Sequence, residues 1–266
     1  MSKQKLNFKT KSYPVTAKTE VSPGTFLFRL EGNINFKPGQ FIEVSADHFG
    51  EATLAPCSDL LETNSFEICV RSCGSTSNGL ANLLPGDKMD IRGPYGNGWP
   101  SEKIKNKEII MIAGGLGLVP LRPLIYQLLS KKQKNVTLVA GFRSSEHLLF
   151  EEDLRVWSSK FKVLAIAEYA VEHFWGKKGL ITDGISSLKI NSKKTVVLIC
   201  GPEAMIPFCI EALAKENIPE NQIFISYERR MECGIGVCQH CNIGQYLVCA
   251  DGPVFRYDKI KPEIGK

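Results

Sequence analysis

The sequence lacks the features that mark membrane, secreted and nucleic-acid-binding proteins. No stretch approaches the roughly 20 consecutive apolar residues of a membrane-spanning helix. The opening residues, MSKQKLNFKTKSYP, contain no apolar core, so a secretory signal is not expected. The 33 Lys and Arg residues exceed the 28 Asp and Glu residues by only five and form no long basic run, which argues against nucleic-acid binding. We expect a cytoplasmic protein without a membrane span.

Groupings of acid–base or nucleophilic side chains are also missing. His48, His147 and His173 are dispersed with no metal-ligand spacing, and no Ser/His/Asp set or carboxylate pair stands out. This pattern is typical of redox proteins, in which a cofactor supplies the chemistry and the protein supplies position and electrostatics.

Cysteine, by contrast, is plentiful and clustered. Nine cysteines are present, and four of them fall within seventeen residues, whereas the others are scattered among apolar residues. With no signal peptide a disulfide framework is not expected, and a cluster of thiols in a reducing compartment indicates a metal site. The predicted ligands are Cys233, Cys238, Cys241 and Cys249.

The spacing of these cysteines, C-x4-C-x2-C-x7-C, opens as plant-type [2Fe–2S] sites do. Zinc sites usually pair their cysteines in two CxxC hairpins, and this run holds one, but a zinc knuckle stays an alternative. Gly234, Gly236 and Gly244 allow backbone N–H groups to turn toward sulfur. His240, beside the third cysteine, is a further candidate ligand.

Three regions that differ in their pattern of apolar and turn residues predict an α/β plus all-β architecture. Residues 1–104 read as short strands and turns with one helix near 75–84, which predicts an antiparallel β-barrel. Residues 105–226 alternate buried strands with helices, which predicts a parallel sheet in an α/β domain. Residues 227–266 are rich in Gly and Cys without helical periodicity, as expected for an appended metal-binding loop.

Two glycine-containing turns of the middle region are candidates for binding a nucleotide. Each follows a predicted strand and precedes a predicted helix, where a pyrophosphate is favoured by close backbone approach and by the helix N-terminus. Both turns open on the carboxyl edge of one parallel sheet. They are the GGxGxxP loop with Gly114, Gly115 and Gly117, and the turn of Cys200, Gly201 and Pro202.

Arg143 ends the strand between these two turns. Its guanidinium there is placed to face a ribose 2′-phosphate, which would favour NADP. A solvated surface arginine is the alternative.

The order of β-rich region, GGxGxxP loop, CGPEAM turn and cysteine segment resembles the ferredoxin–NADP reductase superfamily. Within it, the chain is most similar to electron-transfer subunits that end in a [2Fe–2S] segment. These are the gamma subunit of sulfhydrogenases (NAD(P)-linked hydrogenases) and the electron-transfer subunits of anaerobic sulfite reductase and of dihydroorotate dehydrogenase. The resemblance covers nearly the whole chain. Its most specific parts are the cysteine segment with the DGPVF that follows it, and the phrase RGPYGNG at 92–98.

The resemblance implies an FAD site on the N-terminal region. Where the superfamily has an RxYS strand, this chain reads LAPCS at 54–58; the Arg and Tyr are absent, and Pro and Ser remain. Ser58 is implied to lie near the flavin N5. The other implied flavin contacts are Pro56 and Cys57 in the same strand, Val70 and Arg71, and the turn of Gly74, Ser75, Thr76 and Ser77 near the pyrophosphate. A helix cap that binds nothing is the alternative for that turn.

The resemblance also implies the function. NAD(P)H would give a hydride to FAD, and single electrons would pass through the [2Fe–2S] cluster to or from the catalytic and iron–sulfur subunits of a redox complex, with a hydrogenase or sulfur-reductase type favoured. Cys200 would contact the nicotinamide without covalent catalysis. Subunits of dihydroorotate dehydrogenase or anaerobic sulfite reductase are the alternatives. An alternative of another class is a flavin-free scaffold with structural zinc.

Overall fold

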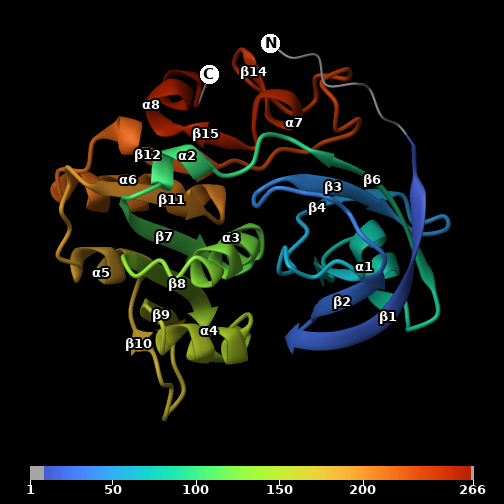
Figure 1. The fold of residues 1–266 in the computed structure, drawn as a ribbon, viewed down its shortest axis with the longest axis horizontal. Helices are drawn as coiled ribbons and strands as arrows, with labels where there is room; N and C mark the ends of the chain where they lie inside the picture. The colour runs from blue at the N-terminus through green and yellow to red at the C-terminus, as the bar shows by residue number, and fades with distance from the viewer. Residues whose placement is uncertain (1–8, 265–266) are drawn as a thin grey trace.

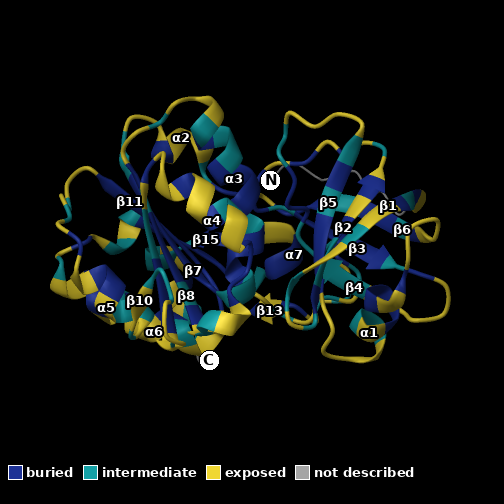
Figure 2. Cartoon of the chain, turned by 90° about the horizontal axis from the view of Figure 1, so that it is seen from below, coloured by how far each residue is buried: buried dark blue, intermediate teal, exposed yellow. Residues whose placement is uncertain are grey.

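The computed structural model describes residues 9–264, which form two lobes and a C-terminal segment. The N-terminal sheet makes one lobe, the second sheet with its helices makes the other, and the C-terminal segment lies across the top of both (Figure 1). Buried residues fill the inside of each lobe and continue where the lobes meet (Figure 2).

The N-terminal lobe is a six-stranded antiparallel sheet in the order β4-β3-β6-β1-β2-β5. Alternating apolar residues of these strands face one core, which includes Phe28, Leu30, Ile42 and Ile68. The strands are β1 (Lys11–Ser22), β2 (Thr25–Glu31), β3 (Phe41–Ser45), β4 (Glu51–Leu54), β5 (Ser65–Arg71) and β6 (Lys88–Tyr95).

This sheet is not the closed barrel that the sequence predicts. Its edge strands β4 and β5 share no ladder, and the described chain joins this side through an isolated bridge between Pro56 and Ile68. The reason is local: Pro56 has no N–H to donate, and β4 ends at Leu54 before a ladder with β5 forms. Helix α1 (Ser75–Asn82) follows β5 and packs against β4 and β5.

The second lobe contains the predicted parallel sheet, in the order β10-β9-β8-β7-β11-β12-β15. Neighbouring strands from β10 to β12 are parallel, and β15 is antiparallel to β12. The strands are β7 (Glu108–Gly114), β8 (Val136–Ser144), β9 (Lys162–Tyr169), β10 (Lys177–Lys178), β11 (Thr195–Cys200), β12 (Ile223–Ser226) and β15 (Val254–Arg256).

Helices cover both faces of this sheet because its central strands are apolar on both sides. In β7, Ile109 and Met111 face the core beneath one pair of helices, whereas Ile110 and Ile112 face the other pair. The first pair is α3 (Leu118–Ser130) and α4 (Glu151–Ser158), and the second is α5 (Ile181–Ser186) and α6 (Ile206–Lys215). No helix within residues 9–264 is long and apolar enough to cross a membrane.

The C-terminal segment is more than the appended loop that the sequence predicts. It contains β13 (Asn242–Ile243), β14 (Tyr246–Leu247), α7 (Val248–Asp251) and α8 (Tyr257–Ile260), and its strand β15 completes the second sheet. Val248, Cys249 and Ile260 are fully buried in the core that α5 and α6 also line. The short α2 (Ser101–Ile104) links the first sheet to the second.

Candidate functional site

The two predicted nucleotide-binding turns pack directly against each other. The loop after β7 forms a short 3-10 helix, η1 (Gly115–Gly117), that leads into α3, while β11 beside it ends at Cys200. A Cβ on Gly117 would lie 2.0 Å from the Cys200 carbonyl oxygen, and one on Gly201 would lie 2.9 Å from the Gly114 nitrogen. Only glycine permits this backbone contact, which brings both turns to the carboxyl edge of the sheet.

This edge suits a phosphate group. Gly115 has a φ of +51° and open space around its Cα, and the amino end of α3 directs backbone N–H groups outward. Pro202 is the last residue of the second turn and has no N–H of its own. Cys200 is 1% exposed, and burial raises the pKa of its thiol to about 12, so the thiol stays protonated near neutral pH. Arg143 lies at the same edge near the end of β8, with its side chain exposed.

The predicted flavin strand runs along the interface between the lobes. Cys57 donates its backbone N–H to the Glu67 carbonyl oxygen at 2.8 Å and is fully buried. Ser58 is 2% exposed, yet its hydroxyl has no hydrogen-bond partner in the described chain. A buried hydroxyl without a partner is costly, so it fits a site where a bound group completes the hydrogen bond. The Ser58 hydroxyl is therefore available to a bound group at the interface between the lobes.

The predicted pyrophosphate turn is the amino end of α1. Val70 is buried at the end of β5, and Arg71 after it is exposed. The Ser77 hydroxyl accepts hydrogen bonds from the N–H groups of Cys73 and Gly74, at 3.1 and 2.9 Å, so it is used in capping the helix. The other predicted pyrophosphate contacts, Gly74, Ser75 and Thr76, lie at the start of α1 and are exposed or half-exposed.

The four clustered cysteines lie in two pairs. The N–H of Cys238 points at the Cys233 sulfur at 3.4 Å, and the sulfurs of Cys241 and Cys249 are 3.3 Å apart. Within residues 9–264, no three His, Cys, Asp or Glu side chains gather around one point as a mononuclear metal site needs. The four thiols of the predicted metal site therefore lie as two neighbouring pairs.

The backbone around these sulfurs directs N–H donors at them. Gly236 donates its N–H to the Cys249 sulfur at 3.0 Å, and Val237 donates to the Cys233 sulfur at 3.3 Å. Burial alone would raise the pKa of Cys233, but backbone hydrogen bonds from Cys238, Ile235 and Val237 lower it to about 6. His240 is exposed beside Glu232, so the structure gives no support to His240 as a ligand.

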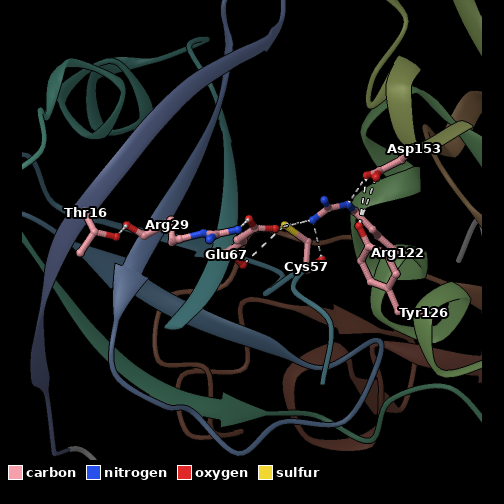
Figure 3. A network of polar contacts seen from close by, with 7 residues as sticks. All are labelled: Thr16, Arg29, Cys57, Glu67, Arg122, Tyr126 and Asp153. Atoms are coloured by element: carbon pink, nitrogen blue, oxygen red, sulfur yellow. Dashed lines mark hydrogen bonds and ion pairs between the residues drawn. The ribbon is translucent and has the colours of Figure 1, made fainter. Parts of the chain in front are cut away.

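One residue that the sequence analysis missed joins the two lobes. Arg122, in α3 just after the glycine loop, donates from Nη1 to the Cys57 carbonyl oxygen at 2.9 Å and to Glu67 at 2.6 Å. Its Nε donates to Asp153 of α4 at 2.8 Å, and the guanidinium is almost fully buried (Figure 3). A charged residue inside the apolar stretch LVPLRPLIYQLL was the available signal. The flavin strand and the nucleotide loop are thereby fixed to each other.

A second missed set joins the N-terminal sheet to the cysteine segment. Arg92 in β6 donates to the carbonyl oxygens of Cys233 and Glu232, at 2.5 and 3.3 Å. Asn97 donates from its side-chain amide to the carbonyl oxygens of Asp251 and Val254, at 3.0 and 2.8 Å. Both residues belong to the phrase RGPYGNG, so the two most specific phrases of the sequence lie in contact.

Of two cavities within residues 9–264, one lies away from the predicted site residues and the other borders Ser58 and Arg122. The larger of two cavities, about 440 Å³, lies at the amino ends of β7 and β8 and is lined by none of the predicted site residues. The smaller, about 200 Å³, lies beside Ser58 and is lined by the charged groups of Arg29, Glu67 and Arg122. Nucleotides bind at carboxyl edges in such sheets, so the packed turns locate the site better than cavity size does.

Comparison with known proteins assigns each part of the chain. The oxidoreductase FAD-binding domain matches residues 12–99, and the oxidoreductase NAD-binding domain matches residues 111–211. The iron–sulfur cluster binding domain of dihydroorotate dehydrogenase B matches residues 228–261. The sulfhydrogenase 1 gamma subunit of Pyrococcus furiosus is 36% identical, over 87% of this chain and 85% of its own length. The chain belongs to this family of FAD- and NAD-binding electron-transfer subunits with a C-terminal iron–sulfur domain.

A second relative agrees with this assignment, and two solved structures share the fold. A probable dihydroorotate dehydrogenase B (NAD(+)) electron transfer subunit of Pyrococcus furiosus is 35% identical, over 93% of this chain and 91% of its own. A solved structure of an NADH-dependent reduced ferredoxin–NADP oxidoreductase has a TM-score of 0.78 and 24% identity, over 99% of this chain and 94% of that one. The flavohem-like FAD/NAD-binding domain of a Vibrio cholerae nitric oxide dioxygenase gives 0.71 at 15% identity, over 80% and 96%. The oxidoreductase class that the resemblance implies is confirmed, and so is the predicted fold class apart from the closed barrel.

The Arg122–Glu67 contact predicts a pH dependence of stability. Burial alone would raise the pKa of Glu67, but Arg122 and Arg29 lower it below its usual value. A lowered folded-state pKa stabilises the protein above the unfolded value of about 4.3, and this contribution is lost as the pH falls through the folded value. Glu67→Gln should cost about 3–5 kcal/mol at pH 7 and should lessen the fall in unfolding free energy below pH ~4.3. Urea unfolding at a series of pH values measures both.

Glu211→Gln is the control for that measurement. Glu211 forms an exposed pair with Lys215 on α6, and loss of such a pair should cost about 0.5 kcal/mol or less. An equal loss of unfolding free energy in the two variants would show that the Arg122–Glu67 pair stabilises the protein no more than an exposed ion pair does.

The contact of the two turns predicts a strong effect of Gly117→Ala. Its Cβ would overlap the Cys200 carbonyl, a backbone atom that cannot move aside, so the variant should lose about 3 kcal/mol of stability and bind NAD(P)H more weakly. Gly115→Ala meets no neighbouring atom and should show only the strain of a positive φ, about 1–2 kcal/mol. Thermal unfolding and titration with NADH compare the two. A Gly117→Ala protein as stable as the wild type would contradict the packing of the turns.

Proposed function

We propose that this protein is an NAD(P)H oxidoreductase subunit that passes electrons between NAD(P)H, FAD and a [2Fe–2S] cluster, and from there to or from a partner catalytic subunit. The observation that carries this proposal is the pairing of the four cysteines on a segment that contacts both lobes. A relay needs its redox groups near one another, and this segment meets the flavin-type sheet and the nucleotide-type sheet at once. We propose domain limits of 1–104, 105–226 and 227–266.

We assign the FAD site to the interface strand and the amino end of α1. FAD, when bound, would accept one hydride, which carries two electrons, and pass those electrons on one at a time, which the protein cannot do with its own side chains. The orphan hydroxyl of Ser58 would complete its hydrogen bond on the flavin ring, with Pro56 and Cys57 beside it. The arginine of the RxYS strand, which would compensate the negative charge of the pyrophosphate, is absent here. Arg71 and the amino end of α1 would compensate that charge instead.

NAD(P)H would bind at the packed glycine turns. The amino end of α3 would hold the pyrophosphate, and Cys200 would contact the nicotinamide as a neutral thiol. Arg122 holds the turn and the flavin strand in one arrangement, so a nucleotide on the first would be presented to a flavin on the second.

For the metal centre we propose [2Fe–2S] bound by Cys233, Cys238, Cys241 and Cys249. The C-x4-C-x2-C spacing, the two sulfur pairs and the N–H donors support it. A structural zinc remains the competing hypothesis, which the two-pair arrangement disfavours.

For the partner we propose a hydrogenase or sulfur-reductase assembly in the cytoplasm. The sulfhydrogenase gamma subunit supports it, and free clustered thiols suit a reducing compartment. Catalytic and iron–sulfur subunits of that complex would supply the site for the terminal substrate. The dihydroorotate dehydrogenase subunit is the second candidate, because its identity to this chain is almost equal.

An anaerobic absorbance spectrum, before and after addition of NADH or NADPH, tests this function. Flavin bands and a broad iron–sulfur shoulder that bleach on reduction are expected. Cys238→Ala should lose the shoulder and keep the flavin bands, whereas Cys73→Ala, an exposed cysteine outside the cluster, should keep both. A colourless protein with stoichiometric zinc would reject the proposal.

The position of Arg143 predicts nucleotide preference. If its exposed guanidinium binds the 2′-phosphate, Arg143→Ala should raise the KM for NADPH by roughly tenfold, the effect of losing about 1.4 kcal/mol, and leave that for NADH unchanged. Steady-state flavin reduction with both nucleotides measures this, and Arg155→Ala on the surface of α4 is the control. Equal effects on both nucleotides would remove the role.

A further inference from the structure

The entrance to the cysteine loop rests on a buried ionic contact with the N-terminal sheet. Arg92 of β6 donates two hydrogen bonds to Glu51 of β4, each of 2.6 Å, and its remaining donors reach the carbonyl oxygens of Glu232 and Cys233. The Arg92 side chain is 9% exposed, and that of Glu51 is 34% exposed. A full charge is thus held in a poorly solvated place next to the first cysteine of the cluster.

The loop is shaped to accept this contact. Gly234 has a φ of +71°, and a Cβ there would lie 3.0 Å from the Glu43 carboxylate and 3.3 Å from the Tyr95 ring. The loop backbone therefore lies flat against the sheet. By holding the Cys233 carbonyl, Arg92 also fixes the plane of the peptide that joins Cys233 to Gly234.

We propose that Arg92 is a positioning and tuning residue for the metal centre: its charge, balanced by Glu51, sets the reduction potential of the cluster bound by Cys233 and its three partners. The inference rests on the proposed function, because it requires a redox-active cluster. Reduction adds one electron to the cluster. A nearby cation stabilises that added negative charge and an anion opposes it, and both effects are large where water is excluded.

Substitutions of the two members of the Arg92–Glu51 pair should shift the midpoint potential of the cluster in opposite directions. Arg92→Gln removes the cation but keeps an N–H donor, so the midpoint potential should shift to more negative values. Glu51→Gln removes the balancing anion, so the potential should shift to more positive values. Arg92→Lys keeps the charge and should restore a potential close to that of the wild type. A purely structural role would shift the first two variants in the same direction.

The measurement is a dye-mediated redox titration of the purified full-length protein at one fixed pH, followed by the EPR signal of the reduced cluster. A fixed pH matters because burial raises the pKa of nearby Glu43 to about 7. Arg155→Gln, which removes a cation from α4, is the charge control and should leave the potential unchanged. Shifts of equal sign, or none, in Arg92→Gln and Glu51→Gln would overturn the inference.

Two outcomes keep this inference separate from the proposed function. A wild-type protein without an EPR signal on reduction rejects the function and the inference together, whereas a normal signal with unmoved potentials rejects the inference alone. If Arg92→Gln fails to fold, Glu51→Gln still decides: its partly exposed side chain makes it the milder change, and it must move the potential upward.

Discussion

Arg122 brings a positive charge into a nearly dry interface, and the charge is stabilised only while both lobes keep their places. Its acceptors come from the flavin strand, from β5 and from α4 (Figure 3). Removing any one of them leaves a buried charge with fewer partners, which is costly. The hydrogen bonds of this one guanidinium fix the distance between the nucleotide loop and the flavin strand. A covalent linker alone would leave the two lobes free to move relative to each other.

The C-terminal segment depends on the same kind of constraint. It is tied to the first sheet by Arg92 and Asn97 and to the second by the pairing of β15 with β12. Because it contacts both lobes, it also limits their movement. These contacts within the chain are enough to hold the cysteine segment near the flavin strand. Cys233 and Cys238 are partly exposed, so a partner protein can approach them.

The sequence predicted the parts whose signal is local. The C-x4-C-x2-C-x7-C spacing, the strand–glycine–helix turns and the alternation of strands and helices each lie within a few tens of residues, and the structure and comparisons bear out the resulting domain order. Most of what the sequence did not predict depends on pairing at long range. The incorporation of β15 into the second sheet and the partners of Arg122 and Arg92 join residues that are far apart in the chain. The open edge between β4 and β5 instead has a local cause at Pro56, which the strand pattern alone did not reveal.

Two charged residues in apolar segments gave a physical signal all the same. Arg122 interrupts an apolar helix, and Glu43 interrupts the apolar strand FIEVS, and a charge in such a place is buried only at high cost unless a partner compensates it. Arg122 has such partners, whereas one oxygen of Glu43 has none in the described chain. Ser58 is the other buried orphan. Glu43 lies against Gly234 of the cysteine segment, and Ser58 belongs to the predicted flavin strand. Buried polar groups without a hydrogen-bond partner therefore mark the same two sites that the sequence motifs predict.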